Sequence, residues 1–201
     1  MATKGEQTRE KILVEARLVF KQKGFGAATI NDLLAAAGIT KGNLYFHFAD
    51  KETIGLEVLK REQQSFYRFL DQAFEGGSPI EGLEKLFHSS LDKNRQQGFV
   101  GGCLFGNTAL EASDTSPVFA AVVQEVFTEW IARVAQVITA AQAAEQIRTD
   151  ISAEGLAELV VATIEGGIMQ ARLQKDENPL KRSLDTLRTL LEMETVPQMN
   201  L

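Results

Sequence analysis

Residues 40–52, with the sequence TKGNLYFHFADKE, concentrate side chains that can bind a polyanion. Lys41 can donate to guanine acceptors or to phosphate, and Thr40 and Asn43 can form hydrogen bonds with bases or phosphates. Gly42 has no side chain, so a DNA backbone can approach the chain closely at this point. The segment fits poorly in a core and is too apolar for a loose loop, so its chemistry favours nucleic-acid recognition.

Aromatic and basic side chains continue the same segment. Tyr45 and His47 place polar tips near a DNA backbone, and Lys51 opens the next predicted helix, whose N-terminal amides can also take a phosphate. We expect the rings of Phe46 and Phe48 to pack within the domain instead. Taken singly, Lys41 is also compatible with a solvated charge and His47 with an ordinary surface histidine.

These residues must be positioned by helices, because apolar residues recur at helical spacing along almost the whole chain. Thr29 is a good N-cap for a helix over residues 30–37. Gly38 permits a tight turn after it, and Thr40 caps a short helix to about residue 46. Two helices joined in this way predict a helix-turn-helix, whose second helix enters the major groove of DNA.

The rest of the chain shows neither convincing strand alternation nor an internal repeat. Further helices are predicted at about residues 50–74, 80–97, 103–112, 117–146, 152–174 and 178–193. Together with a first helix ending near Gly24, they predict an all-α fold of about nine helices.

Charge is distributed unevenly along the 201 residues, whose net charge is −6. Residues 1–60 carry 9 Lys and Arg against 7 Asp and Glu, whereas residues 61–201 carry 12 against 20. A mildly basic head on an acidic body suits a local contact with a polyanion, although chance variation gives the same asymmetry.

Residues 8–54 resemble the DNA-binding domain of the TetR family of one-component bacterial regulators. The features shared with its signature are Phe20, Gly24, Thr29, Ile30, Ala35, Ala37, Gly38, Gly42, Tyr45, Phe48, Lys51 and Glu52. The resemblance implies a helix-turn-helix DNA-binding domain over residues 1–52 and a helical effector-binding and dimerisation domain over residues 53–201. It further implies a homodimer, a palindromic double-stranded operator, and release of DNA when a small-molecule effector binds. DNA contacts are then expected from Thr29, Thr40, Lys41, Gly42, Asn43, Tyr45, His47 and Lys51.

A second informative segment, GGCLFGNTALEASD at residues 101–114, resembles a TetR-like subgroup in which some members respond to electrophiles or small organic acids. Together with apolar faces of two later helices, it predicts an effector pocket. The candidate lining residues are Cys103, Asn107, Glu111, Phe127, Trp130, Ile168, Met169 and Arg172. A plain hydrophobic core gives the same pattern, and Cys103 is either a reactive thiol or a small buried side chain.

The last two predicted helices are candidates for the dimer interface. Their apolar stripes are Leu156, Leu159, Val160, Thr163 and Gly167 on one helix, and Leu184, Leu187 and Leu191 on the other. The alternative is that these leucines face only the core of a single chain.

Several classes of function are disfavoured by the sequence. The two histidines, His47 and His88, lie in different predicted domains, and no metal-ligand spacing or nucleotide-binding fingerprint is present. We therefore expect no enzyme, no metal and no cofactor. A single cysteine, the lack of a signal-peptide pattern and the lack of a membrane span favour the cytoplasm. The alternative function is a helical ligand-binding or partner-binding protein without specific DNA recognition.

Overall fold

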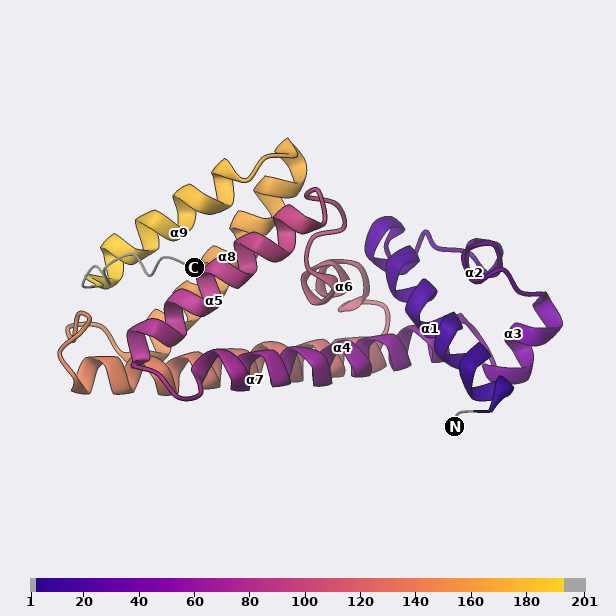
Figure 1. Ribbon diagram of the computed structural model, residues 1–201, viewed down its shortest axis with the longest axis horizontal. Helices are drawn as coiled ribbons and strands as arrows, with labels where there is room; N and C mark the ends of the chain where they lie inside the picture. The colour runs from indigo at the N-terminus through magenta and orange to yellow at the C-terminus, as the bar shows by residue number, and fades with distance from the viewer. Residues whose placement is uncertain (1–2, 194–201) are drawn as a thin grey trace. The chain divides into compact units, whose positions relative to one another are not determined.

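The computed structural model describes residues 3–193, and within this range the chain forms nine α-helices and no strand (Figure 1). The helices are α1 (Lys4–Lys23), α2 (Ile30–Ala37), α3 (Lys41–His47), α4 (Lys51–Phe74), α5 (Pro79–Gln96), α6 (Leu104–Ala112), α7 (Pro117–Ala143), α8 (Ala153–Gln174) and α9 (Asn178–Leu191). The predicted all-α fold is confirmed.

The helices fall into two compact units. The head unit comprises residues up to 65 together with residues 103–124, and the body unit comprises residues 66–102 and those from 125 onward. Helices α4 and α7 each contribute to both units. The boundary expected between residues 52 and 53 lies near the start of α4, which continues through it.

The head unit is built on the amphipathic helix α1. Thr3 and Glu6 form a capping box at its start, so two of the amides that a helix N-terminus leaves unpaired are satisfied. Its apolar face, which includes Leu13 and Phe20, is buried, and its polar face forms an ion pair from Arg9 to Glu57 of α4. These contacts hold α1 against α4.

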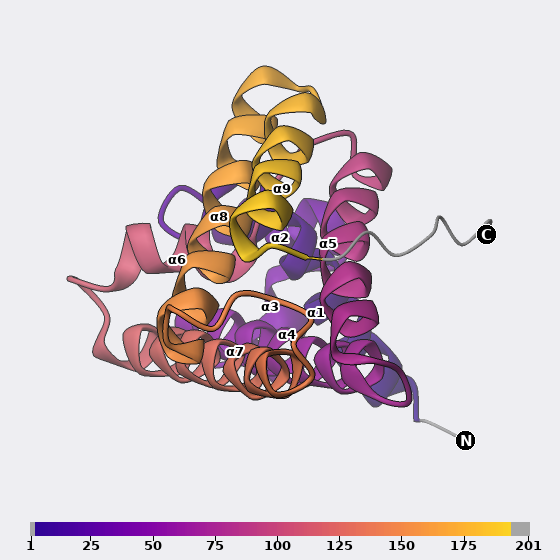
Figure 2. The same ribbon diagram turned by 90° about the vertical axis from the view of Figure 1, so that its left-hand side faces the viewer.

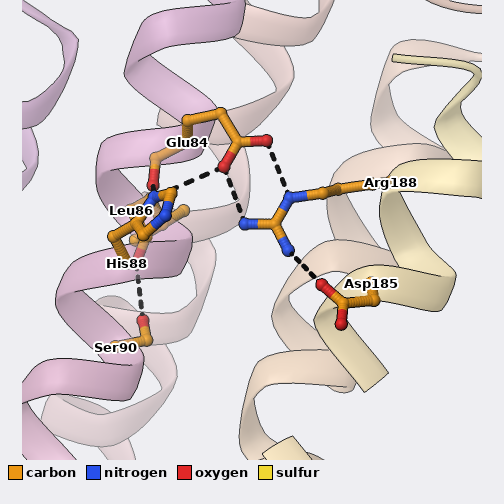
Figure 3. Close-up of polar contacts among 6 residues, drawn as sticks. All are labelled: Glu84, Leu86, His88, Ser90, Asp185 and Arg188. Carbon is orange, nitrogen blue, oxygen red and sulfur yellow. Dashed lines mark hydrogen bonds and ion pairs between the residues drawn. The ribbon is translucent and has the colours of Figure 1, made fainter. Parts of the chain in front are cut away.

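In the body unit, α5, α8 and α9 lie side by side, as both views show (Figures 1 and 2). Close approach of α8 and α9 depends on Gly167, because a Cβ there would lie 2.6 Å from Leu180 Cδ1. A partly buried ion pair also joins α5 to α9. Arg188 donates to both carboxylate oxygens of Glu84 at 2.7 Å, and also to Asp185 (Figure 3). The hydrogen bond with Glu84 raises the pKa of Arg188 above its ordinary value.

The leucine stripe expected at the dimer interface packs inside the body unit instead. Leu156, Val160, Leu184, Leu187 and Leu191 are all fully buried in the core of one chain. That part of the prediction is wrong, because α5 and α7 supply partners for the stripe within the chain. Of the stripe, Leu159 and Thr163 remain accessible.

Candidate DNA-binding site

Two capped helices and a left-handed glycine shape the helix-turn-helix. Thr29 caps α2 by accepting a hydrogen bond from the Asp32 amide at 3.2 Å. Gly38 ends the helix with φ 62°, a backbone conformation that favours glycine and turns the chain sharply. Thr40 then caps α3 by accepting from the amide of Asn43 at 3.3 Å. The predicted elements are therefore present.

Helix α3 presents a polar and aromatic face away from the rest of the head unit. Leu44 is fully buried and anchors the helix, whereas Lys41, Gly42, Asn43 and Tyr45 are exposed. The ammonium of Lys41 lies 5.9 Å from the centroid of the Tyr45 ring. A Cβ added to Gly42 would meet nothing within 4 Å, so the surface is open there. These four predicted DNA contacts share one accessible helix.

The three aromatic residues that end the segment differ in their packing. Phe48 is buried, as expected, but the expectation that Phe46 packs is wrong, because its side chain is 82% exposed. Leu44 and Phe48, the residue that follows α3, are both buried, so Phe46 is left on the opposite side of the helix. His47 is half-buried, and its ring meets Phe46 edge-on with centroids 5.0 Å apart. The position of Phe46, two residues after the buried Leu44 on a helix, is the feature of the sequence from which its outward orientation could have been predicted.

Lys51 points into the head unit. Its ammonium donates to the carbonyls of Phe25 and Ala28, each at 2.8 Å, and to that of Gly26 at 3.4 Å. It also lies 4.6 Å from the centroid of the Phe25 ring. The side chain of Asp50 accepts from the Thr53 amide at 2.7 Å, which places a carboxylate at the start of α4. Both groups expected to receive a phosphate here therefore have partners within the chain.

Thr29 is engaged with a carboxylate as well as capping α2. Its hydroxyl donates to Asp32 at 2.9 Å, and Lys23 donates to the same side chain at 2.6 Å. The hydrogen bond from Lys23, followed by those from Thr29, lowers the pKa of Asp32 to about 2. The cap role of Thr29 is confirmed, and its phosphate contact stays a prediction.

Helix α6 contributes to the head unit through Glu111. Its carboxylate accepts from the Gly26 amide at 3.1 Å and lies over Gly24, where a Cβ would come within 2.3 Å of Oε1. Asn107 and Glu111 line a small cavity with the apolar residues Phe20, Phe25, Gly55, Val58, Leu59, Leu104 and Phe119. Its volume is about 10 Å³, enough for no more than one water molecule. Within the head unit, these two candidates for the effector pocket lie at a packed junction.

The other effector-pocket candidates have different surroundings. Cys103 belongs to the head unit, is partly exposed and precedes α6 at its N-cap position without capping it through its side chain. In the body unit, Trp130 is buried between Phe66 and Phe127, with ring centroids 5.0 and 6.0 Å away.

Ile168 and Arg172 lie beside Gly102 in the body unit, whereas Met169, between them on α8, is 60% exposed. Met169 therefore adds nothing to the buried wall of this unit. A lining role for Ile168 and Arg172 stays a prediction.

The acidic, histidine and cysteine side chains form no metal-binding cluster in the part of the chain that the structure describes. No group of three or more His, Cys, Asp or Glu side chains in residues 3–193 is placed to hold a metal ion. His88 bonds the Glu84 carbonyl of its own helix, and its ring is exposed. Over the same residues, no helix is long and apolar enough to cross a membrane.

Comparison with known proteins accounts for most of the chain. Residues 12–58 match the model of bacterial regulatory proteins of the tetR family, and residues 79–187 match a tetracyclin repressor-like C-terminal domain. The HTH-type transcriptional repressor DhaR of a Mycobacterium species is 28% identical over 88% of both chains. The transcriptional regulator AcuR of Cereibacter sphaeroides is 32% identical over 79% of this chain and 74% of that protein.

A crystal structure of a TetR regulator from Chloroflexus aurantiacus superposes with a TM-score of 0.84 at 29% identity, covering 94% of this chain and 96% of that one. The matched N-terminal model spans the helix-turn-helix whose outward face is described above. The chain therefore belongs to the TetR family of bacterial transcriptional regulators, as a DNA-binding repressor with a helical ligand-binding C-terminal domain and not as an enzyme.

Proposed function

We propose that this protein acts in the cytoplasm as a homodimer that binds a palindromic operator and leaves it when a small-molecule effector binds. In this proposal residues 1–52 are the DNA-binding domain, and residues 53–201 bind the effector and form the dimer. The observation that carries the proposal is the outward face of α3, where Lys41, Gly42 and Tyr45 are exposed while Leu44 anchors the helix.

The DNA contacts divide by chemistry. Lys41 and Asn43 are assigned to base edges, because they belong to the first turn of the helix that is proposed to enter the major groove. Tyr45 and His47, on the second turn, are assigned to the phosphate backbone. We assign Lys51 to internal support of the head unit, since its ammonium already has three carbonyl acceptors.

The dimer is proposed to form through the accessible surfaces of α8 and α9. A groove of about 460 Å³ on these helices is lined by Thr163, Gln170, Pro179, Arg182, Ser183, Thr186, Leu187 and Leu190. Gly166 opens onto free space on α8, which lets another helix approach closely. A two-fold axis would pair this surface with its own copy.

The effector is proposed to bind in the body unit near Trp130. The indole Nε1 of this buried residue has no hydrogen-bond partner among the described residues. A buried donor without an acceptor is unfavourable, so an effector with an acceptor group and a flat apolar body would suit the surrounding aromatic rings. Modification of Cys103 by an electrophilic effector stays a prediction of the resemblance.

The proposal is tested by selecting operator sequences from random duplex DNA with the purified protein and then titrating the selected duplex. Lys41→Ala should weaken operator binding by roughly 1–3 kcal/mol, whereas Tyr45→Ala and His47→Ala, which remove phosphate contacts, should weaken specific and non-specific binding by similar factors. Lys60→Ala, which removes an exposed lysine from α4, is the matched control. Operator binding that is unchanged in all three variants would refute the assignment of the α3 face.

A further inference from the structure

Phe46 is an outward-facing side chain of α3. It is 82% exposed and follows the fully buried Leu44 by two residues, which is about 200° around the helix. One turn earlier on the same side are Gly42 and Asn43, and a Cβ at Gly42 would meet nothing within 4 Å. The centre of the outward face is therefore an apolar ring with open space beside it.

Exposure alone does not distinguish Phe46, because single exposed apolar residues are common and Leu110 of α6 is 86% exposed. Two further observations do. Phe46 lies on the helix that enters the major groove, and its ring is held edge-on against His47 at an interplanar angle of 85°. A large apolar side chain is thus presented to DNA in a defined orientation.

The dimensions of α3 place Phe46 within reach of the bases. Seven residues of α-helix are about 10 Å long, whereas the major groove is about 12 Å wide. The sixth residue of this helix can therefore contact base edges as well as the first. A phenyl ring has neither a donor nor an acceptor, so it cannot read the polar pattern of a base pair. The apolar feature of the major groove is the C5-methyl group of thymine.

We propose that Phe46 determines operator specificity by packing against a thymine methyl group in each half-site. This inference rests on the proposed function, since it requires an operator bound through α3. It assigns to Phe46 a specificity role that Lys41, Asn43 and Tyr45 do not fill, because their polar groups read hydrogen-bonding atoms or the backbone.

The experiment removes the methyl group without changing base pairing. Each thymine of the selected operator is replaced by deoxyuridine, symmetrically in both half-sites, and affinities are measured by fluorescence anisotropy at one fixed salt concentration. For the parent protein, replacement at one thymine position should lower the affinity by about fourfold for each half-site, as expected for one apolar methyl contact. The symmetric replacement, which changes both half-sites, should therefore lower it by about 15-fold. Phe46→Ala should bind the thymine operator more weakly than the parent does. Its affinity should not change when the thymine at that position is replaced by deoxyuridine.

Leu110→Ala, which truncates an equally exposed apolar side chain on α6, should keep the deoxyuridine profile of the parent. Circular dichroism of Phe46→Ala should match the parent, since the ring contributes little to the core. Three results would overturn the inference alone: a parent that binds but is insensitive to every methyl group, a Phe46→Ala protein with the parent's sensitivity, or selected half-sites without a shared thymine. A parent that binds no selected duplex would overturn the proposed function and this inference with it.

Discussion

Lys51 shows how the role of one charged side chain depends on what the surrounding backbone leaves unpaired. The turn at residues 25–28 lies between α1 and α2, so its carbonyls lack helical partners, and three of them accept from the Lys51 ammonium. Phe25 covers the same ammonium with its ring face. The position of this lysine in the sequence matches a DNA-contacting signature, but its geometry is that of an internal support.

Replacement of Lys51 by Met keeps most of the apolar stem and removes all three hydrogen bonds. We expect the head unit to lose about 1–3 kcal/mol of stability, because carbonyls in a partly buried turn lose a charged donor. Urea and thermal unfolding measure this loss, with Lys60→Met on the exposed side of α4 as the control.

Salt dependence of DNA binding separates this role of Lys51 from a phosphate contact. A lysine bound to phosphate contributes about one unit to the slope of log affinity against log salt concentration. We expect the slope of Lys51→Met to equal that of the parent. Because the substitution occurs in both chains of the proposed dimer, a slope reduced by about two would return Lys51 to the DNA interface.

At the scale of elements, the turn at residues 24–28 is held by three helices of the head unit. Lys51 of α4 binds its carbonyls, Glu111 of α6 binds the Gly26 amide, and Phe119 of α7 meets the Phe25 ring edge-on with centroids 4.4 Å apart. Gly55 of α4 makes room for both rings, because a Cβ there would lie 2.4 Å from Phe25. The entry to α2, and hence the helix-turn-helix, is therefore fixed partly by a segment more than 80 residues later in the chain.

The contact between α6 and this turn predicts an energetic coupling between Gly24 and Glu111. Gly24 has φ 85° and ψ 159°, so Ala at this position should cost about 1–3 kcal/mol through backbone strain alone. The new Cβ would also displace the Glu111 carboxylate and break its bond to Gly26. Gly24→Ala should therefore cost about 1 kcal/mol more in the parent than in a Glu111→Ala background.

Urea unfolding of the four proteins in this cycle measures the coupling. An Asp114→Ala background removes a neighbouring exposed carboxylate and should leave the cost of Gly24→Ala at its parental value. Equal costs in all three backgrounds would mean that Glu111 contributes no energy to the turn.

For the whole molecule, the features that could be predicted best from the sequence are those that depend on neighbouring residues, namely the helices and their caps. The nine helices and the caps Thr29 and Thr40 were predicted because apolar period and capping side chains are encoded within a few residues. The outward face of α3 was predicted for the same reason, apart from Phe46.

Predictions that depended on contacts between distant segments were less successful. The apolar stripe of α8 and α9 has the same spacing whether it faces a partner or a core, so Leu187 was placed at an interface although α5 and α7 bury it. Likewise, Lys51 and Glu111 carry charges that suit a ligand, and only the folded head unit shows that both contact one turn. Contacts between residues more than 20 positions apart in the chain decide these roles.

The last prediction concerns the dimer, which is proposed to form through the accessible surfaces of α8 and α9. Leu190 is 46% exposed and lines the groove on α8 and α9, whereas Leu187 beside it is fully buried. In a two-fold interface each substitution occurs twice, so Leu190→Glu should place two carboxylates near each other against apolar surface. We expect sedimentation velocity to show monomers with native helicity. Operator affinity should fall steeply, because recognition helices about 34–36 Å apart, or a multiple of this, require both chains.

Leu187→Glu should instead unfold the body unit, since it buries a charge in the core. Leu110→Glu on α6, equally charged and fully outside the groove, should remain dimeric. A Leu190→Glu protein that sediments as a dimer with full operator affinity would place the interface on another surface.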